Sequence, residues 1–200
     1  MHPDPCFHQA DREACRRLVE QIGFAMIFAG TPDGPRVVHA PVVWAGENAI
    51  QFHIARRNPI APHLAGGAAV CVVNGPDAYI SPRWYSDRTQ VPTWNYVAVE
   101  LEGSVRRLDE DALRAQIVTL IATSEARVEH GDAWSLNEAP SGDVDAMVQE
   151  IIGFELAIDA WRPTFKLSQN KSDAERARVA GYLGAAGATD MAAWMRNQAT

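Results

Sequence analysis

Three segments of the sequence hold side chains whose types and spacing suit the binding of an anion or a flat aromatic ring. The first is HIARRNP, residues 53–59, which follows a predicted strand. Asn58 is a favourable N-cap and a proline follows it, so the helix predicted over residues 60–64 would turn its free N–H groups toward the strand end. Arg56 and Arg57 stand beside that positive helix end. These donors suit a phosphate group, and an ordinary capped helix with two surface arginines explains the same pattern.

The second segment, NGPDAYISPRWYSDRTQVPTWNY over residues 74–96, is rich in aromatic side chains. They are Tyr79, Trp84, Tyr85, Trp94 and Tyr96. Glycines and prolines predict an irregular structure, and long aromatic-rich loops in compact domains are often binding elements or interfaces. Aromatic faces suit a flat ring such as isoalloxazine. Packing across a subunit contact is an equally good interpretation, because Trp and Tyr are enriched at interfaces.

The third segment, KLSQN over residues 166–170, places a cation and three polar side chains together after a predicted strand. Lys166 could hold a phosphate group, while Ser168 and Gln169 could contact the polar edge of a ring. A polar loop that leads into a helix is the alternative interpretation.

The motifs of several other chemistries are missing. The sequence has no glycine-rich dinucleotide loop, no Walker A loop, no H-E-x-x-H and no G-x-S-x-G. The histidines show no metal-ligand spacing, so no metal site is predicted. His39 and His53 lie in predicted strands and could face a pocket, although a lone strand histidine is more often structural. Three cysteines without a C-x-x-C predict buried or half-buried thiols and no disulfide framework.

The elements that position these segments follow from the spacing of apolar residues. Helices are predicted over residues 11–22, 60–64, 109–127, 144–152 and 172–198, the last with a glycine break around Gly184 and Gly187. Strands are predicted over residues 24–30, 36–44, 49–55, 68–73, 94–107 and 153–161. Antiparallel strands joined by short turns usually close on themselves to avoid open edges. We therefore expect an α+β fold, a mainly antiparallel barrel with helices packed around it.

Size and charge limit the classes of function. With 200 residues, 47% of them hydrophobic and 22% charged, the chain suits one globular domain over 1–200, with a helical extension from about residue 172. A net charge of −7 and a pI near 5.3 argue against DNA binding through a large basic face, although a small local patch remains open. No apolar run reaches the roughly 18 residues of a membrane helix, and the N-terminus does not resemble a secretory signal. A cytoplasmic protein without a membrane partner is expected.

Taken together, the segments resemble the PaiB-type family of FMN-binding negative transcriptional regulators. HIARRNP is similar to H-x-A-R-x-N-P, NGPDAYISPRWY to G-P-x-A-Y-I-S-P-x-W-Y, and VPTWNYVAVELEG to V-P-T-W-N-Y-x-x-V-x-x-x-G. IIGFELAID and KLSQN follow in the expected order, and the resemblance runs from Pro3 to about Leu183. Departures are His2, where an aromatic residue such as Tyr is expected, and Ala133, where Pro is expected.

The resemblance implies an antiparallel split β-barrel of the FMN-binding type, related in fold to pyridoxamine phosphate oxidases, with the flavin at a homodimer interface. It implies that Arg56 and Asn58 contact the phosphate, with help from Lys166. It places His53 and Ala55 beside the flavin ring. The remaining implied contacts are Trp94, Asn95 and Tyr96, which would line the pocket, and Gln169, a polar contact.

The leading functional hypothesis is a flavin-binding regulator in which flavin redox state or occupancy biases the dimer. The alternative is an FMN-dependent oxidoreductase acting on a small molecule, in which the cofactor does the redox work and the protein orients it. Haem or tetrapyrrole handling is a third hypothesis, and it would need an axial histidine that the sequence does not single out. No catalytic residue is identified.

Overall fold

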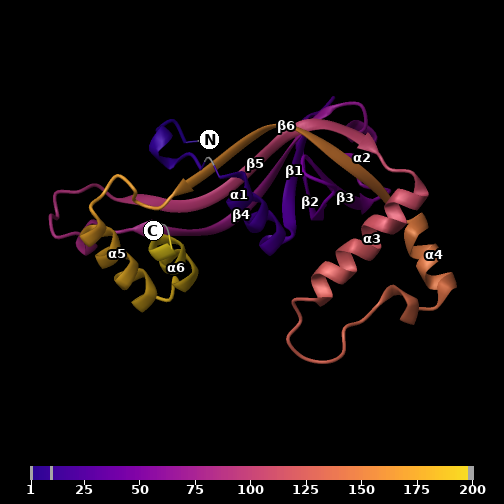
Figure 1. Cartoon of the computed structure of the whole chain (residues 1–200). Helices are drawn as coiled ribbons and strands as arrows, with labels where there is room; N and C mark the ends of the chain where they lie inside the picture. Colours follow the sequence, from indigo (N-terminus) through magenta and orange to yellow (C-terminus); the bar gives the residue numbers. More distant parts are fainter. Residues whose placement is uncertain (1, 10, 198–200) are drawn as a thin grey trace. The chain divides into compact units, whose positions relative to one another are not determined.

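The computed structural model describes residues 2–9 and 11–197. In this part of the chain, six strands form an antiparallel sheet that closes as a barrel in the order β1-β2-β3-β6-β5-β4 (Figure 1). The strands are β1 (Phe24–Thr31), β2 (Gly34–Trp44), β3 (Ala49–Ala55), β4 (Ala68–Ile80), β5 (Thr93–Arg107) and β6 (Ile151–Lys166). The predicted α+β split barrel with flanking helices is therefore confirmed.

The helices lie between and after these strands. They are α1 (Arg12–Ile22), α2 (Ala61–Leu64), α3 (Glu110–Glu125), α4 (Ser141–Gln149), α5 (Asp173–Ala185) and α6 (Thr189–Asn197), with short 3-10 turns η1 (Pro5–Phe7), η2 (Pro82–Trp84) and η3 (Leu136–Glu138). Among the described residues, no helix is long and apolar enough to cross a membrane. The predicted helical stretch at the C-terminus divides into α5 and α6 around Gly187, which has a φ of 89°. Its predicted end, Gln198, lies outside the described residues.

Residue contacts divide the chain into two compact units. Unit 1 comprises the described residues of 1–15, 74–99 and 162–200, and unit 2 comprises 16–73 and 100–161. Strands β4, β5 and β6 and helix α1 each contribute residues to both units. The expectation of a single domain over 1–200 stays a prediction.

Strand β3 shows how the apolar pattern places side chains on opposite faces of the sheet. Ile50, Phe52 and Ile54 are buried, and their neighbours in sequence point to the other face. The ring of Phe52 stacks against that of Phe154 on β6 with 5.6 Å between centroids. His53 therefore faces outward from the barrel core.

Two strands are longer than the sequence predicts. β4 continues to Ile80 although residues 74–80 were predicted to be irregular. Buried and exposed side chains alternate as far as Val73, and after residues 74–77 the alternation resumes, shifted by one residue, with Ala78 and Ile80 buried. β6 continues to Lys166, beyond Pro163, where Phe165 is again buried. Proline removes one ladder donor and is tolerated where that donor is not needed.

Close packing in unit 2 explains one glycine. A Cβ atom on Gly103 in β5 would lie 1.8 Å from the carbonyl oxygen of Ala157 on β6. No side chain fits at that distance. Only glycine allows the two strands to approach at this point.

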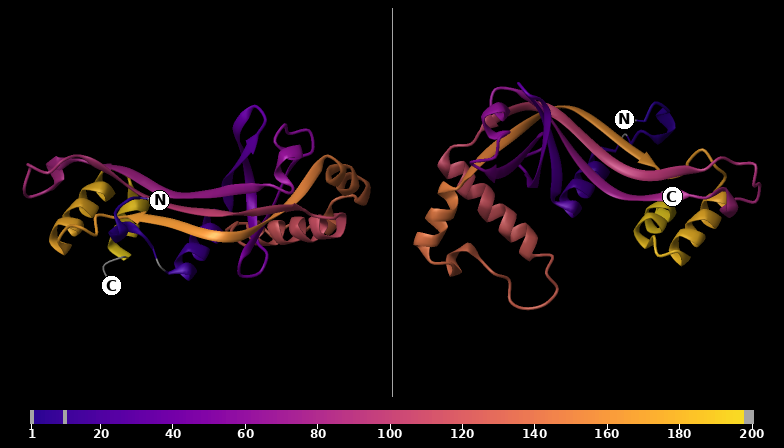
Figure 2. Two further views of the ribbon diagram at one scale, coloured as in Figure 1. Left: turned by 90° about the horizontal axis from the view of Figure 1, so that it is seen from above. Right: turned by 180° about the vertical axis from the view of Figure 1, so that it is seen from behind.

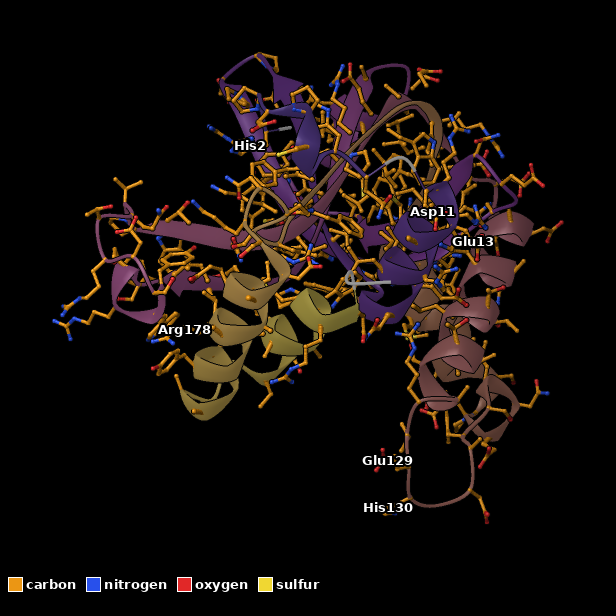
Figure 3. All side chains as sticks on the ribbon, turned by 60° about the vertical axis from the view of Figure 1, so that its left-hand side comes forward. His2, Asp11, Glu13, Glu129, His130 and Arg178 are labelled. Carbon is orange, nitrogen blue, oxygen red and sulfur yellow. The ribbon has the colours of Figure 1, made fainter. Side chains whose placement is uncertain are left out.

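In unit 1, α5 and α6 lie side by side (Figure 2). The η2 turn is fastened to α5, because the Nε of Arg178 donates to the carbonyl oxygen of Trp84 at 2.8 Å. Figure 3 shows Arg178 projecting from α5. The indole of Trp84 also stacks on Tyr182 with 6.1 Å between ring centroids. Part of the aromatic-rich segment is therefore held by packing within its own unit.

Candidate functional site

The HIARRNP segment lies where β3 ends and the chain turns toward α2. Arg56 crosses from this turn to the end of α4 and the start of β6. Its Nε donates to the carbonyl oxygen of Gln149 at 2.7 Å and its Nη2 to that of Ile151 at 2.7 Å. Its backbone N–H donates to Glu150 at 2.8 Å. These bonds fix the plane of the guanidinium and leave Nη1 without a bond to any other described residue.

Arg56 lines a polar pocket of about 200 Å³ in unit 2. The other lining residues are Arg107, Leu108, Asp109, Glu110, Leu113, Val148, Gln149, Ile152 and Gly153. The two carboxylates already have partners, since Asp109 accepts from the N–H of Ala112 at 2.8 Å and Glu110 pairs with Arg114 at 2.9 Å. The pocket therefore offers two guanidinium groups to an incoming anion.

Asn58 acts as a turn residue. Its Oδ1 accepts from the N–H of Ile60 at 3.1 Å, and its carbonyl oxygen accepts from the N–H of Ala61 at 3.0 Å. Helix α2 has only four residues, beginning at Ala61. Two of the N–H groups that the sequence interpretation assigned to an anion thus have partners in the chain, which leaves the arginines as the donors for a phosphate. Contact of Asn58 with phosphate stays a prediction.

His53 pairs with a residue that the sequence analysis did not identify. Its Nδ1 lies 2.9 Å from Oε1 of Gln116 on α3. Gln116 is 1% exposed, and its Nε2 has no hydrogen-bond partner among the described residues. The sequence signal that could have identified Gln116 is a polar residue on the same face of α3 as Leu113 and Ile117. Ala55, two residues after His53, is exposed at the strand end.

Trp94, Asn95 and Tyr96 lie at the start of β5 in unit 1, where side chains alternate between the two faces. Trp94 is 55% exposed and meets Tyr79 edge to face, with 6.0 Å between ring centroids. Tyr96 is half-buried. Asn95 is fully buried, and its Nδ2 donates to Oγ of Ser168 at 2.9 Å. The exposed pair Trp94 and Tyr79 can stack on a ring, whereas the amide of Asn95 is used inside the unit.

The KLSQN segment ends β6 and forms a tight loop. Nζ of Lys166 donates to Oγ1 of Thr93 at 2.8 Å and lies 5.6 Å from the ring centroid of Phe7. The amide of Gln169 folds back on its own loop, accepting from the N–H of Leu167 at 2.7 Å and donating to the carbonyl oxygen of Phe165. Ser168 has a φ of 62°, the left-handed region that a non-glycine residue seldom adopts. The side chains of Lys166 and Gln169, both proposed to contact the flavin, thus form hydrogen bonds within unit 1.

The predicted site residues fall into two groups. His53, Ala55, Arg56 and Asn58 share unit 2, and Trp94, Asn95, Tyr96, Lys166 and Gln169 share unit 1. Within unit 1, the start of β5 meets the KLSQN loop through two side-chain bonds, Lys166 to Thr93 and Asn95 to Ser168. The flavin contacts assigned to these residues stay predictions.

The motif pattern has its counterpart in known proteins. Residues 1–160 match the family described as "Putative FMN-binding domain". The chain belongs to this PaiB-type FMN-binding family. A curated relative is "Protease synthase and sporulation protein PAI 2" from Bacillus subtilis, which is 27% identical over 181 residues, or 88% of this chain and 86% of the relative.

Solved structures share the fold of this PaiB-type chain. One is the FAD and haem binding protein from Mycobacterium smegmatis, with a TM-score of 0.62, 18% identity, and coverage of 85% of this chain and 78% of that chain. Another is the flavocytochrome Anf3 from Azotobacter vinelandii, with a TM-score of 0.61, 14% identity, and coverage of 88% and 78%. At these identities the likeness establishes the split-barrel fold of the PaiB-type chain.

The thiols of this PaiB-type chain divide by burial. Cys15 and Cys71 are buried and Cys6 is exposed, so the expectation of three buried or half-buried thiols was wrong for Cys6. Burial raises the pKa of the Cys71 thiol to about 12 and that of Cys15 to about 11, because a thiolate loses its hydration in an apolar interior. All three cysteines are free.

Proposed function

We propose that this chain binds FMN and that the flavin phosphate lies in the pocket between Arg56 and Arg107. The observation that carries the proposal is the guanidinium of Arg56, which two backbone carbonyls orient at the pocket wall. A fixed guanidinium loses little additional conformational entropy when it binds, and the N–H groups of its unbonded Nη1 can donate to phosphate oxygens. Membership of the family supports FMN as the flavin.

The donor set of unit 2 fits a flavin mononucleotide in chemical terms. Arg56 and Arg107 supply charge for a phosphate group. His53 lies on β3, on the same strand end as Ala55, and can form a hydrogen bond with the polar edge of a ring. When bound, the flavin supplies electron transfer, while the residues of the chain bind and orient it.

We also propose that the chain is a homodimer that pairs through the outer face of β1, β2 and β4 in unit 2. In the register of these strands, outward-facing side chains lie opposite one another as Phe24 with Pro41, Met26 with His39 and with Val72, and Phe28 with Val37 and with Val70. Phe24 is 52% exposed, Val37 45% and Phe28 38%. Contiguous exposed apolar side chains of this kind mark interaction sites.

The lack of charged side chains on this face favours a second copy of the chain as its partner. The outward-facing residues just named carry no acidic or Lys/Arg side chain, although the chain has a net charge of −7. Two copies with the same negative charge approach best through an uncharged face, and a two-fold axis would pair the same patch with itself.

The biological role that we propose is negative transcriptional regulation of the PaiB type. The net charge of −7 argues against a repressor that grips DNA through a large basic face. Regulation through a protein partner or a metabolite fits the acidic chain better. Flavin occupancy or redox state would bias the dimer and so transmit the signal.

The test is the visible spectrum of the purified protein after FMN addition and gel filtration, for the wild type, Arg56→Ala and Arg57→Ala. Arg57 is the matched control, because its side chain is 88% exposed and makes only a long 3.7 Å ion pair with Glu150. We expect Arg56→Ala to weaken FMN binding at least about tenfold, the effect of one lost charge-assisted hydrogen bond. Arg57→Ala should stay within about twofold.

Three outcomes would contradict parts of this proposal. A wild-type protein that retains no FMN and shows none on titration would overturn the flavin function. Equal binding by Arg56→Ala and the wild type would move the phosphate elsewhere. Turnover of NAD(P)H or oxygen by the flavin would assign the chain to the oxidoreductases instead of the regulators.

A further inference from the structure

Gln116 is a buried polar residue in a helix face that otherwise packs apolar side chains. Leu113 and Ile117, its neighbours on α3, belong to a core cluster with Leu108 and Val148. Oε1 of Gln116 meets Nδ1 of His53 at 2.9 Å, while Nε2 is buried and has no partner among the described residues. Buried polar atoms nearly always have a partner, so an exception requires an explanation.

Packing in unit 2 sets the position of this pair. In the register of β3 and β6, His53 lies opposite Gly153. A Cβ on Gly153 would lie 2.9 Å from Cδ1 of Leu113 and 3.0 Å from Cδ1 of Leu108. Because residue 153 has no side chain, α3 can lie close to the sheet, and Gln116, about one turn after Leu113, reaches the outward-facing His53. The contact is therefore built into the fold.

The contact between Gln116 and His53 is not a favourable arrangement for the stability of the fold. A glutamine amide has one acceptor oxygen and one donor nitrogen, whereas Nδ1 of His53 engages only one of them. Because Oε1 faces Nδ1, it is Nε2 of Gln116 that stays unpaired, and an unpaired buried polar atom costs free energy. An apolar residue of the same size would avoid that cost. The presence of Gln116 therefore points to its effect on His53.

Gln116 determines which ring nitrogen of His53 carries the proton. A carbonyl oxygen only accepts hydrogen bonds, so contact with Oε1 requires that Nδ1 of the imidazole carries the proton. The other ring nitrogen, Nε2, then carries a lone pair. A neutral histidine in this state accepts a hydrogen bond at Nε2 and cannot donate one there.

We propose that Gln116 is a positioning residue of the flavin site, which holds His53 as the Nδ1–H tautomer so that Nε2 accepts a hydrogen bond from a ring N–H. The inference rests on the proposed flavin function. The N3–H at the polar edge of the isoalloxazine ring is a donor of this kind. Gln116 acts through His53 and does not itself contact the ring.

The first experiment measures the tautomer directly, in flavin-free protein, by NMR of ¹⁵N-labelled histidine side chains. We expect the proton of His53 on Nδ1 in the wild type and on Nε2 in Gln116→Leu. Gln51→Leu is the matched control, because Gln51 lies on the same face of β3 but donates to Glu155 at 2.8 Å and not to His53. An Nε2–H tautomer in the wild type, or an unchanged tautomer in Gln116→Leu, would overturn the inference.

The second experiment is FMN titration of the same proteins. We expect Gln116→Leu to bind FMN about tenfold more weakly, since one hydrogen bond to the ring is lost, while its thermal unfolding midpoint stays within a few degrees of the wild type. Gln116→Glu keeps an acceptor for Nδ1 and, at a pH high enough to keep the imidazole neutral beside the carboxylate, should preserve both the tautomer and FMN binding within about threefold. If the leucine variant does not fold, the tautomer of the wild type and the FMN affinity of Gln116→Glu still test the inference.

The two experiments separate failure of the inference from failure of the proposed function. A wild type that does not bind FMN overturns the flavin function, and the NMR result still reports the tautomer. A wild type that binds FMN, together with Gln116→Leu that binds equally well, leaves the flavin function intact and overturns the positioning role.

Discussion

The candidate site residues of the two units differ in how many of their polar atoms are already bonded within the protein. In unit 1, Asn95, Lys166 and Gln169 are all engaged by other groups of the unit. In unit 2, Arg56 keeps one guanidinium nitrogen without a described partner, and Gln116 has an unpaired amide nitrogen. Charge differs as well: unit 2 has nine arginines against seventeen acidic residues, and unit 1 has nine Arg and Lys residues against eight acidic residues.

A family motif can therefore contain residues of two kinds. A side chain whose donors and acceptors are all used within the protein stabilises the fold, and its replacement acts on stability. A side chain with an unused polar atom beside a pocket is available to a ligand, and its replacement acts on binding.

Replacement of Asn95 by leucine should act on stability. It leaves Ser168 without its buried amide partner, and Ser168 already sits in a left-handed backbone conformation. We expect a loss of about 3 kcal/mol in the free energy of unfolding, measured by urea titration. FMN affinity, measured well below the unfolding midpoint, should change less than about twofold. A large loss of affinity with little loss of stability would show that Asn95 contacts the flavin.

Replacement of Phe28 by glutamate tests the apolar face of unit 2. In a two-fold dimer each copy would bring its own carboxylate into the interface, so we expect the dimer dissociation constant to rise at least about 100-fold. Analytical ultracentrifugation over a concentration series measures it. Val118→Glu is the control, because Val118 on α3 is 52% exposed but lies outside this face. Equal dissociation constants for Phe28→Glu and the wild type would exclude this face as the interface.

The smallest effect concerns the thiols. A folded pKa above the unfolded value means that the protonated Cys15 and Cys71 stabilise the fold below about pH 9, the ordinary thiol pKa, and that this contribution falls as the pH rises toward 11 and 12. We expect the free energy of unfolding to fall gradually above pH 9. Measured from each protein's own value at pH 7, this fall should be smaller for Cys71→Ala than for the wild type. Thiol titration of native protein at pH 8 should label Cys6 alone.

Much of the fold could be predicted because the strands of unit 2 alternate clearly. Residues 49–55, for example, coincide with β3, and the helix predicted over residues 11–22 became α1. The far ends of β4 and β6 were missed because Pro76 and Pro163 are usual signals for the end of a strand. Burial of alternate side chains in the folded chain outweighs that local signal.

The residue types of the candidate site can be read from the sequence, whereas the contacts of its side chains cannot. The sequence shows that Arg56 follows a strand, yet the two carbonyls that orient its guanidinium come from residues almost a hundred positions later. Gln116 was missed for the same reason. Its meaning depends on a histidine from another strand and on a glycine that lets α3 approach the sheet, and no local pattern encodes such contacts.

The close approach at Gly103 limits how members of the family can diverge. This glycine is the last position of the motif that begins with Val91, and a side chain there would collide with the backbone of β6. The requirement for glycine at this position therefore comes from the packing of the barrel. Under the proposed flavin site, a descendant that has lost its cofactor would still keep Gly103 while accumulating substitutions at Arg56 and Gln116. The ratio of substitutions at these positions would then distinguish members that still bind flavin from those that retain only its scaffold.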